Sequence, residues 1–251
     1  MKSAPDDNPP SCTPPSDTEL AGLRLLQLAD SALPIGSLAH SFGLESLVTA
    51  ELLTVAGLRA FLRTYLEETG KLEAVFCRES RRLAADGVNA FSIGRWRELN
   101  DLLSALKPAR ESRAASASLG QNFLRLVMAL QDSAILREAA VPARPAVGRD
   151  REIVQHCAAF GLVCGVLEIS ADRAALAYLH QSIANLVSAC QRLLPLGQTA
   201  AAQILWDLKP AMLETAQSSA MCGVDEVASF MPLLDWGAME HPAISTRLFI
   251  S

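Results

Sequence analysis

The 251-residue sequence predicts an all-α fold, a single helical bundle of roughly eight to ten helices. Apolar residues recur at helical spacing along most of the chain, whereas the sustained alternation that marks β-strands is nearly absent. Half of the residues are apolar and only 5% are aromatic. A chain of this length and composition can bury one large core, so we expect one principal domain.

Residues 1–15 are rich in Pro, Ser and Asp and offer little apolar surface to bury, so we expect a disordered N-terminal tail. The helical domain is expected over residues 16–251. Ser16 and Glu19 have the spacing of a capping box at its start.

The clearest helical pattern follows Thr54. Gly70 is expected to kink this helix and Gly87 to end it. The apolar stripe of the helix recurs at i, i+3, i+4, i+7 and i+8 and consists of Leu58, Phe61, Leu62, Tyr65 and Leu66.

Further helical stretches follow, two of which we expect a proline to end or kink, at Pro108 and Pro210. Residues 139–148, "AAVPARPAVG", have the composition of a loop. The helical stretches cover about 96–106, 111–131, 150–168, 171–194 and 198–222.

Composition argues against several functional classes. The net charge of -5 disfavours nucleic acid as the main partner, because a phosphate-binding surface normally needs basic excess. The N-terminus has no apolar signal-peptide core, and no apolar run reaches the ~18 residues of a membrane span. The six cysteines form no CxxC pair. We therefore expect a cytoplasmic, reduced protein that binds neither nucleic acid nor membrane.

The stretch "SALPIGSLAHS", residues 31–41, places a serine and a histidine beside a bend. Ser37 and His40 could be a nucleophile and its base, but the chain has no GxSxG elbow here. Alternatively, Pro34 and Gly36 end the first helix and Ser37 caps the second, whose positive N-terminal end Glu45 favours. The bend is the favoured interpretation.

Two other kinds of site are disfavoured. "TGKL" lacks the Ser or Thr that a nucleotide-binding P-loop needs after its lysine. His156 and Cys164 share a helical segment but are separated by about 12 Å along its axis, too far for one ion. His180 and His241 stand alone in the sequence, and a dimer would be needed to pair histidines around an ion.

The C-terminal segment, residues 229–251, is the best candidate for a binding surface. It contains aromatic residues, methionines and an arginine, which are enriched in interface cores. The same residues could instead fold back on the protein's own core, and both outcomes can hold for different residues.

Several motifs closely resemble the urease accessory protein UreF family. The most specific is "LLQLADSALPIGSLAHSFGLE", residues 25–45. The resemblance continues, in the expected order, through "ESRAASASLGQNFLRL" (111–126), "LPLGQTAAAQIL" (194–205), "SFMPLLDWGAMEH" (229–241) and a closing "RLF" with a final serine. It covers nearly everything after the tail.

This resemblance implies an all-α, cytoplasmic, dimeric protein that is not an enzyme. It implies a scaffold and GTPase co-regulator that bridges UreD (also called UreH) and the GTPase UreG, so that nickel is inserted into apo-urease. No cofactor is expected to be bound stably, because the complex handles nickel and UreG binds GTP. A generic helical adaptor and a helical hydrolase using Ser37 and His40 are the alternatives.

The resemblance and the motif chemistry together nominate interface residues toward the partners or a dimer mate. These are Pro34, Gly36, Ser37, His40, Ser41, Glu45, Trp236, His241, Arg247, Leu248 and Phe249. Three positions depart from the family pattern: Leu38 replaces a usual Phe, Ile250 replaces a common basic residue, and His156 lacks the proline of a His-x-Pro motif.

Overall fold

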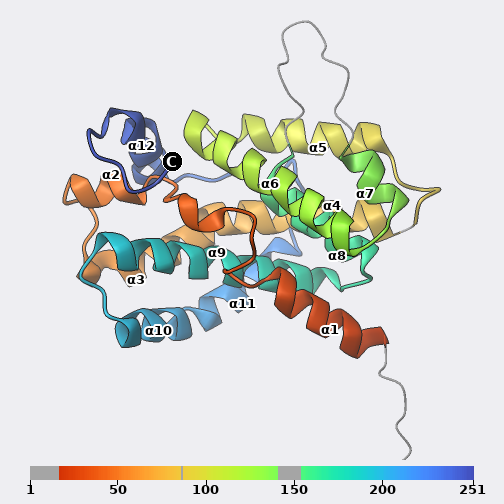
Figure 1. The fold of residues 1–251 in the computed structure, drawn as a ribbon, viewed down its shortest axis with the longest axis horizontal. Helices are drawn as coiled ribbons and strands as arrows, with labels where there is room; N and C mark the ends of the chain where they lie inside the picture. The colour runs from red at the N-terminus through yellow and green to blue at the C-terminus, as the bar shows by residue number, and fades with distance from the viewer. Residues whose placement is uncertain (1–16, 86, 141–153) are drawn as a thin grey trace, which may run out of the picture.

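The computed structural model describes residues 17–85, 87–140 and 154–251 (Figure 1). Every regular element in these ranges is helical, which confirms the all-α prediction. The predicted tail, the Ser16 cap and most of the 139–148 loop lie outside the described residues.

Ten α-helices of nine or more residues and two six-residue helices occur within the described ranges. They are α1 (Asp17–Leu28), α2 (Leu44–Thr49), α3 (Val55–Tyr65), α4 (Lys71–Ala85), α5 (Ile93–Ala105), α6 (Arg110–Leu130), α7 (Ala134–Ala139), α8 (His156–Val166), α9 (Ala171–Leu193), α10 (Gln198–Asp207), α11 (Lys209–Ser219) and α12 (Pro232–Glu240). Short 3₁₀ turns cover Ser37–Ala39 and His241–Ala243.

Local signals set several helix ends. The Thr54 side chain accepts a hydrogen bond from the backbone N–H of Gly57 and so caps α3. At Gly70 the expected kink is a π-helical turn, Leu66–Gly70, that joins α3 to α4. Gly87 has a φ of 82° just beyond α4, as a terminating glycine should. Pro210 separates α10 from α11, which divides the predicted 198–222 helix.

The helix α8 is the centre of the bundle. It is apolar on all sides, and ten of its eleven residues are buried. It contacts α4, α6 and α9. A Cβ atom on Gly161 would lie 1.9 Å from the carbonyl oxygen of Cys77, so only glycine permits the observed approach of α8 to α4.

Two hydrophobic clusters divide the core, one around α8 and one that α3, α9, α10 and α11 share with the C-terminal segment. The long helix α9 contributes to both, with Tyr178 in the first and Leu186 in the second. Figure 1 shows α2 and α12 at one end of the bundle, and these two helices pack on each other. The two motifs at the start and end of the domain therefore meet there.

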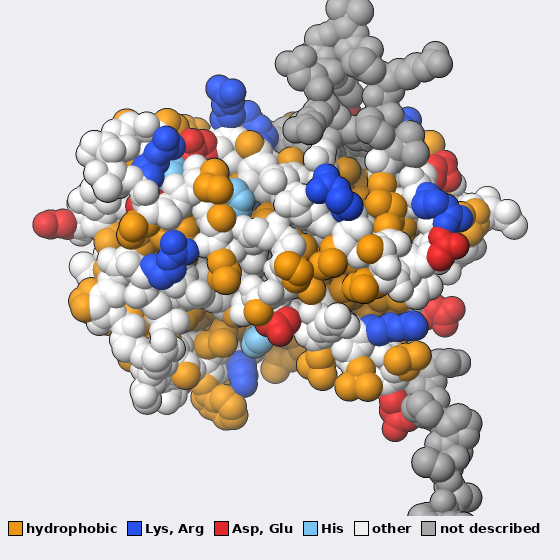
Figure 2. Space-filling model, viewed as in Figure 1, with side chains coloured by type: hydrophobic (Ala, Val, Ile, Leu, Met, Phe, Trp, Pro, Cys, Tyr) orange, Lys and Arg blue, Asp and Glu red, His pale blue; other side chains and the backbone are white. Residues whose placement is uncertain are grey.

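No helix in the described part of the chain combines the length and apolarity that a membrane span requires. Figure 2 shows one face of the molecule, on which Lys and Arg side chains lie in separate small groups rather than one basic patch.

Candidate functional site

The candidate site is the place where the C-terminal segment (residues 229–251) docks against the signature bend (residues 31–45). Glu45 is its centre. This residue lies in the first turn of α2 and is buried. Its carboxylate accepts hydrogen bonds from the backbone N–H groups of Leu248 (2.6 Å) and Phe249 (3.2 Å). A predicted interface glutamate thus holds the end of the chain's own C-terminal segment.

His241 lies between two carboxylates. Its Nε2 is 3.0 Å from Oε2 of Glu45, and its Nδ1 is 2.8 Å from Oε2 of Glu111 on α6. The imidazole side chain is 0% exposed. His241 stands alone in the sequence because its two partners are 196 and 130 residues away in the chain, and the fold brings all three side chains together.

The residues around His40 hold the last residue of the segment. The backbone N–H groups of Ser41 and Phe42 donate to the carbonyl oxygen of Ser251, at 2.5 and 3.3 Å. The Nδ1 atom of His40 lies 2.7 Å from the hydroxyl of Ser251. Burial lowers the pKa of the His40 imidazole. His40 is thus a docking residue for Ser251.

The predicted role of Ser37 as a cap is wrong. Gly36, with a φ of 91°, precedes the 3₁₀ turn, and Gly43, with a φ of 93°, precedes α2. Pro34 and Gly36 do not end the first helix. It ends at Leu28, and the N–H of Asp30 then donates to the carbonyl of Gln27 in a turn. The hydroxyl of Ser37 donates to the carbonyl of Ser31 at 3.4 Å. His40 contacts Ser251 instead of Ser37, so the two do not form a nucleophile–base pair.

Arg192, at the end of α9, is a docking residue that the sequence did not reveal. Its guanidinium donates to the carbonyl oxygens of Leu38 (2.7 Å) and Leu248 (3.4 Å), and it lies 4.1 Å from the ring centre of Phe249. One planar cation therefore clamps bend and segment together. Its position two residues before the matched 194–205 motif was the available signal.

Two glycines bring the backbones of α2 and α12 together. A Cβ on Gly43 would lie 2.6 Å from the backbone nitrogen of Ala238, and one on Gly237 would lie 2.5 Å from the carbonyl oxygen of Gly43. Both glycines occur in the matched motifs, in "HSFGLE" and "DWGAMEH". Glycine is required at both positions because any Cβ atom would prevent the backbones of α2 and α12 from coming this close.

The C-terminal segment has both buried and exposed apolar side chains. The expectation that it folds back on the core is confirmed for the buried ones, and the role of the others as a binding surface stays a prediction. Met231, Leu234 and Phe249 pack into the core. The exposed apolar face consists of Phe230, Leu233, Trp236, Met239, Leu248 and Ile250. Arg247 is exposed beside this face, and Pro34 and Gly36 are exposed on the bend.

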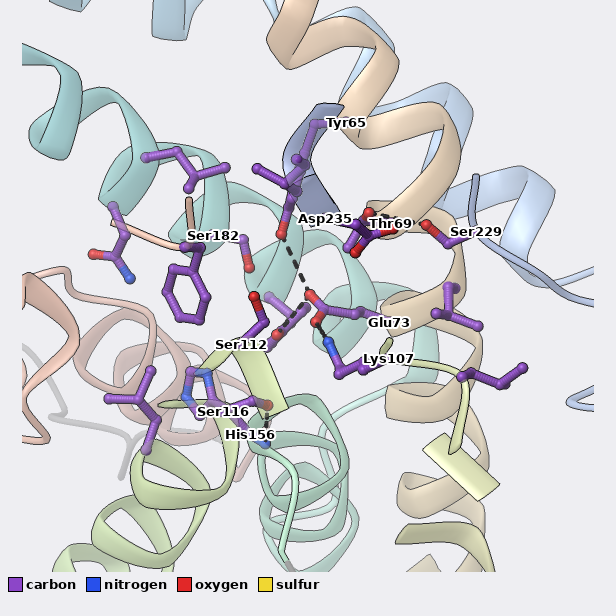
Figure 3. A pocket seen from close by; sticks show the side chains of 18 of the residues that line it. Tyr65, Thr69, Glu73, Lys107, Ser112, Ser116, His156, Ser182, Ser229 and Asp235 are labelled. Carbon is purple, nitrogen blue, oxygen red and sulfur yellow. Dashed lines mark hydrogen bonds and ion pairs between the residues drawn. The ribbon is translucent and has the colours of Figure 1, made fainter. Parts of the chain in front are cut away.

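A second buried polar group lies beneath the segment (Figure 3). The carboxylate of Glu73 on α4 accepts from the hydroxyls of Tyr178 (3.0 Å) and Tyr65 (3.4 Å) and pairs with the ammonium of Lys107. Burial and then the Glu73 charge raise the pKa of both tyrosines well above their usual range. Burial opposes the charge on Lys107, yet the adjacent Glu73 raises its pKa overall.

His156 borders the same group, in a cavity of about 80 Å³. Burial lowers the pKa of His156 to about 4, so the ring is neutral. Its Nε2 is buried without a hydrogen-bond partner. Ser229 and Asp235 of the C-terminal segment border the cavity, and burial raises the pKa of Asp235.

The described residues contain no group of three or more His, Cys, Asp and Glu side chains placed to hold a metal ion. Cys157 and Cys164 are buried in α8, and burial raises the pKa of both thiols above the usual range. Buried neutral thiols in an apolar helix behave as small hydrophobes.

The fold and site define an all-α protein whose most elaborate polar contacts hold its own C-terminal segment against its signature bend. A model of the UreF family matches residues 52–209. Urease accessory protein UreF of Bradyrhizobium sp. (strain ORS 278) is 31% identical over 236 residues, which cover 93% of each chain.

The same named protein of Nostoc sp. (strain PCC 7120) is 31% identical over 91% of this chain and 95% of its own. That of Corynebacterium glutamicum (strain R) is 30% identical over 92% of this chain and 98% of its own. The chain belongs to the UreF family of urease accessory proteins, and this membership supports a role in urease maturation.

Proposed function

We propose that this protein is a scaffold and GTPase co-regulator of urease maturation. It bridges UreD (UreH) and the GTPase UreG so that nickel is inserted into apo-urease. It works in the cytoplasm as a homodimer, without enzymatic activity, and contacts neither nucleic acid nor membrane. The complex handles nickel and UreG binds GTP, so this chain holds no stable cofactor of its own.

The observation that carries this proposal is the exposed apolar face of the docked C-terminal segment. Phe230 is 77% exposed and Leu248 is 59% exposed, although Met231 and Phe249 beside them pack into the core. An accumulation of exposed large apolar side chains in one segment is typical of an interaction surface. A segment that is held by backbone and charged contacts presents this face with little ordering cost on binding.

Arg247 adds a polar element to the same surface. An arginine offers five donors in a rigid fork that can pair with a partner's carboxylate. Its side chain is exposed next to Leu248, which supplies an apolar anchor. This combination of arginine and apolar anchor is typical of interface residues that dominate binding free energy.

The proposal is tested by pulling UreG down with the complex of this protein and UreD, using Arg247→Ala and Leu248→Ala. Truncating a well-buried interface arginine costs about 2–4 kcal/mol, roughly 30- to 1000-fold in affinity. Urease produced beside these variants should lack nickel. Leu130→Ala is the matched control, because Leu130 on α6 is also 59% exposed but lies away from the segment.

Assembly and urease activation that survive both Arg247→Ala and Leu248→Ala would contradict the proposed interface. If Leu130→Ala also abolishes assembly and urease activation, the loss in the other two variants reflects a general effect on folding. The backbone N–H of Leu248 still reaches Glu45 in Leu248→Ala, so the segment itself should stay docked.

A further inference from the structure

We propose that His241 is a proton-binding latch: the C-terminal segment docks when the imidazole is protonated and releases as the proton is lost. The inference concerns contacts within the chain and does not depend on which partners the protein binds.

The donor and acceptor count at His241 is the first argument. An ionised carboxylate only accepts hydrogen bonds, and a neutral imidazole has one donor nitrogen. Both ring nitrogens of His241 lie within 3.0 Å of a carboxylate oxygen. Two such contacts are both hydrogen bonds when the ring is an imidazolium. With a neutral ring, one nitrogen lone pair would face a carboxylate, or a carboxylate would need the proton instead.

Burial of the His241 ring and its partners strengthens the effect of its charge. The His241 side chain is 0% exposed and that of Glu45 is 4% exposed, whereas that of Glu111 is 22% exposed. Solvent therefore screens these charges poorly. Removal of the central positive charge leaves two carboxylates on either side of a neutral ring, and a buried charge without a partner is strongly unfavourable.

Three basic side chains near the docking site make contacts other than with the His241 ring. His40, the other titratable group there, contacts the hydroxyl of Ser251. Arg192 on α9 binds the carbonyl oxygens of Leu38 and Leu248. Arg113 on α6 binds the carbonyl oxygens of residues 107 and 108. In the described structure, the charged groups in contact with the ring are thus Glu45 from α2 and Glu111 from α6.

The latch is coupled to docking through Glu45. The same carboxylate that contacts His241 also accepts from the amides of Leu248 and Phe249. When His241 loses its proton, its single remaining N–H can serve only one of the two carboxylates, so the docked segment loses one of the charge-assisted contacts that hold it. His241 itself lies within that segment, so release separates all three groups.

A metal ion is a poor alternative to the proton here. The carboxylates of Glu45 and Glu111 bind opposite nitrogens of one ring, so all three side chains cannot face a common ion as they stand. The described residues also include no metal-holding group of three such side chains.

The direct measurement is amide hydrogen exchange at Leu248 and Phe249 in the full chain, over about pH 6 to about pH 9. After correction for intrinsic exchange, protection reports the local opening equilibrium. Protection should fall roughly tenfold to hundredfold as the pH rises, the range expected for losing a charge-assisted hydrogen bond. Amides in α8 should keep their protection.

The variant Glu111→Gln sharpens the test. A glutamine amide can donate to Nδ1, so a neutral His241 can be fully hydrogen-bonded, with its Nε2–H on Glu45. Docking should therefore survive in this variant and lose most of its pH dependence. His241→Gln should give weak protection at every pH, since it cannot carry the charge. His180→Gln, which removes a histidine of α9, is the matched control and should behave as wild type.

The proposal is overturned if the two amides keep constant protection across the pH range in wild type. It is equally overturned if Glu111→Gln retains the full pH dependence. NMR titration of the His241 ring gives a second readout that needs no variant: a ring that loses its proton while both amides stay protected contradicts the latch.

Discussion

Two carboxylate clusters are buried in the described part of the chain, and they differ in the cation that each contains. Glu73, in the core, is paired with Lys107 and two tyrosine hydroxyls. Glu45, at the docking site, is paired with His241 and two backbone amides. Lysine stays charged throughout the physiological pH range, whereas histidine titrates within it. The comparison teaches that the cation in the core cluster is permanent and the cation in the docking site is titratable, which is the difference on which the proposed latch depends.

The largest expected effect is on the core cluster. Lys107→Met leaves the Glu73 carboxylate buried without its cation and should cost about 3–5 kcal/mol of unfolding free energy. Urea denaturation measures this cost. The double variant with Glu73→Gln should recover most of the loss. If Lys107→Met costs less than about 1 kcal/mol, the tyrosine hydroxyls alone satisfy Glu73, and the contrast between the clusters weakens.

The second effect is an acid limb due to His156. Its pKa falls from 6.5 in the ordinary state to about 4 in the folded protein, so the unfolded chain binds the proton more tightly. The contribution of the neutral His156 ring to the free energy of unfolding is therefore fully present above about pH 6.5. It falls by about 3 kcal/mol as the pH drops toward about 4.

His156→Phe keeps an aromatic ring among Phe123, Phe160 and Tyr178 and should flatten this acid limb in a series of denaturation curves. An unchanged acid limb in this variant would assign the loss of stability to other groups. The docking site should respond in the opposite pH direction, so the two regions separate in one experiment.

An intermediate effect is expected at the glycine contact between α2 and α12. Gly237→Ala forces a Cβ against the carbonyl oxygen of Gly43 and should cost about 1–3 kcal/mol, confined to the segment. Limited proteolysis should cleave the variant within residues 229–251 while the bundle persists. Gly57→Ala, where the nearest atom is 3.7 Å away, is the control. Global unfolding at a lowered temperature would show that segment and core are one cooperative unit.

Arg192→Met should have a smaller effect, about 1–2 kcal/mol on docking, because two hydrogen bonds to carbonyl oxygens and the guanidinium contact with Phe249 are lost. Faster amide exchange at Phe249 and Ile250 is the readout. Arg192→Lys should restore part of the protection. Exchange that matches wild type in Arg192→Met would remove this residue from the docking site.

The smallest effect is expected at Ser37. Its hydroxyl makes one long hydrogen bond, so Ser37→Ala should change stability by less than about 1 kcal/mol and leave urease maturation intact. Gly36→Val, which forces a branched side chain into a φ of 91°, should cost more. Loss of maturation in a folded Ser37→Ala variant would reopen the catalytic interpretation of the bend.

Short-range signals in the sequence predicted several helix limits. Thr54, Gly87 and Pro210 each act within a turn of their own position, so their effect can be inferred locally. The class of fold followed from periodicity alone. The conversion of the Gly70 kink into a π-helical turn depends on contacts with other helices and could not be inferred.

The candidate site was only half predictable. Glu45 and His241 both lie in matched motifs, but their contact joins residues 196 positions apart, which no local pattern encodes. Glu111 also opens a matched motif, but in sequence it and Arg192 look like ordinary charged residues on solvated helix faces. Glu73 and Lys107 were missed for the same reason, since burial of a charge depends on which helices pack over it.

The π-helical turn Leu66–Gly70 has a consequence for helical phase. An extra residue in one turn rotates everything after it by about 100° around the helix axis. Within this turn Glu68 accepts from the amide of Phe230 at 2.8 Å, and Thr69 lies 3.0 Å from the hydroxyl of Ser229. Deleting one residue here would restore a continuous α-helix, withdraw both anchors from the start of the C-terminal segment and turn Glu73 away from Lys107. One inserted residue thus sets the angular register of the Glu73 cluster relative to the two anchors of the C-terminal segment.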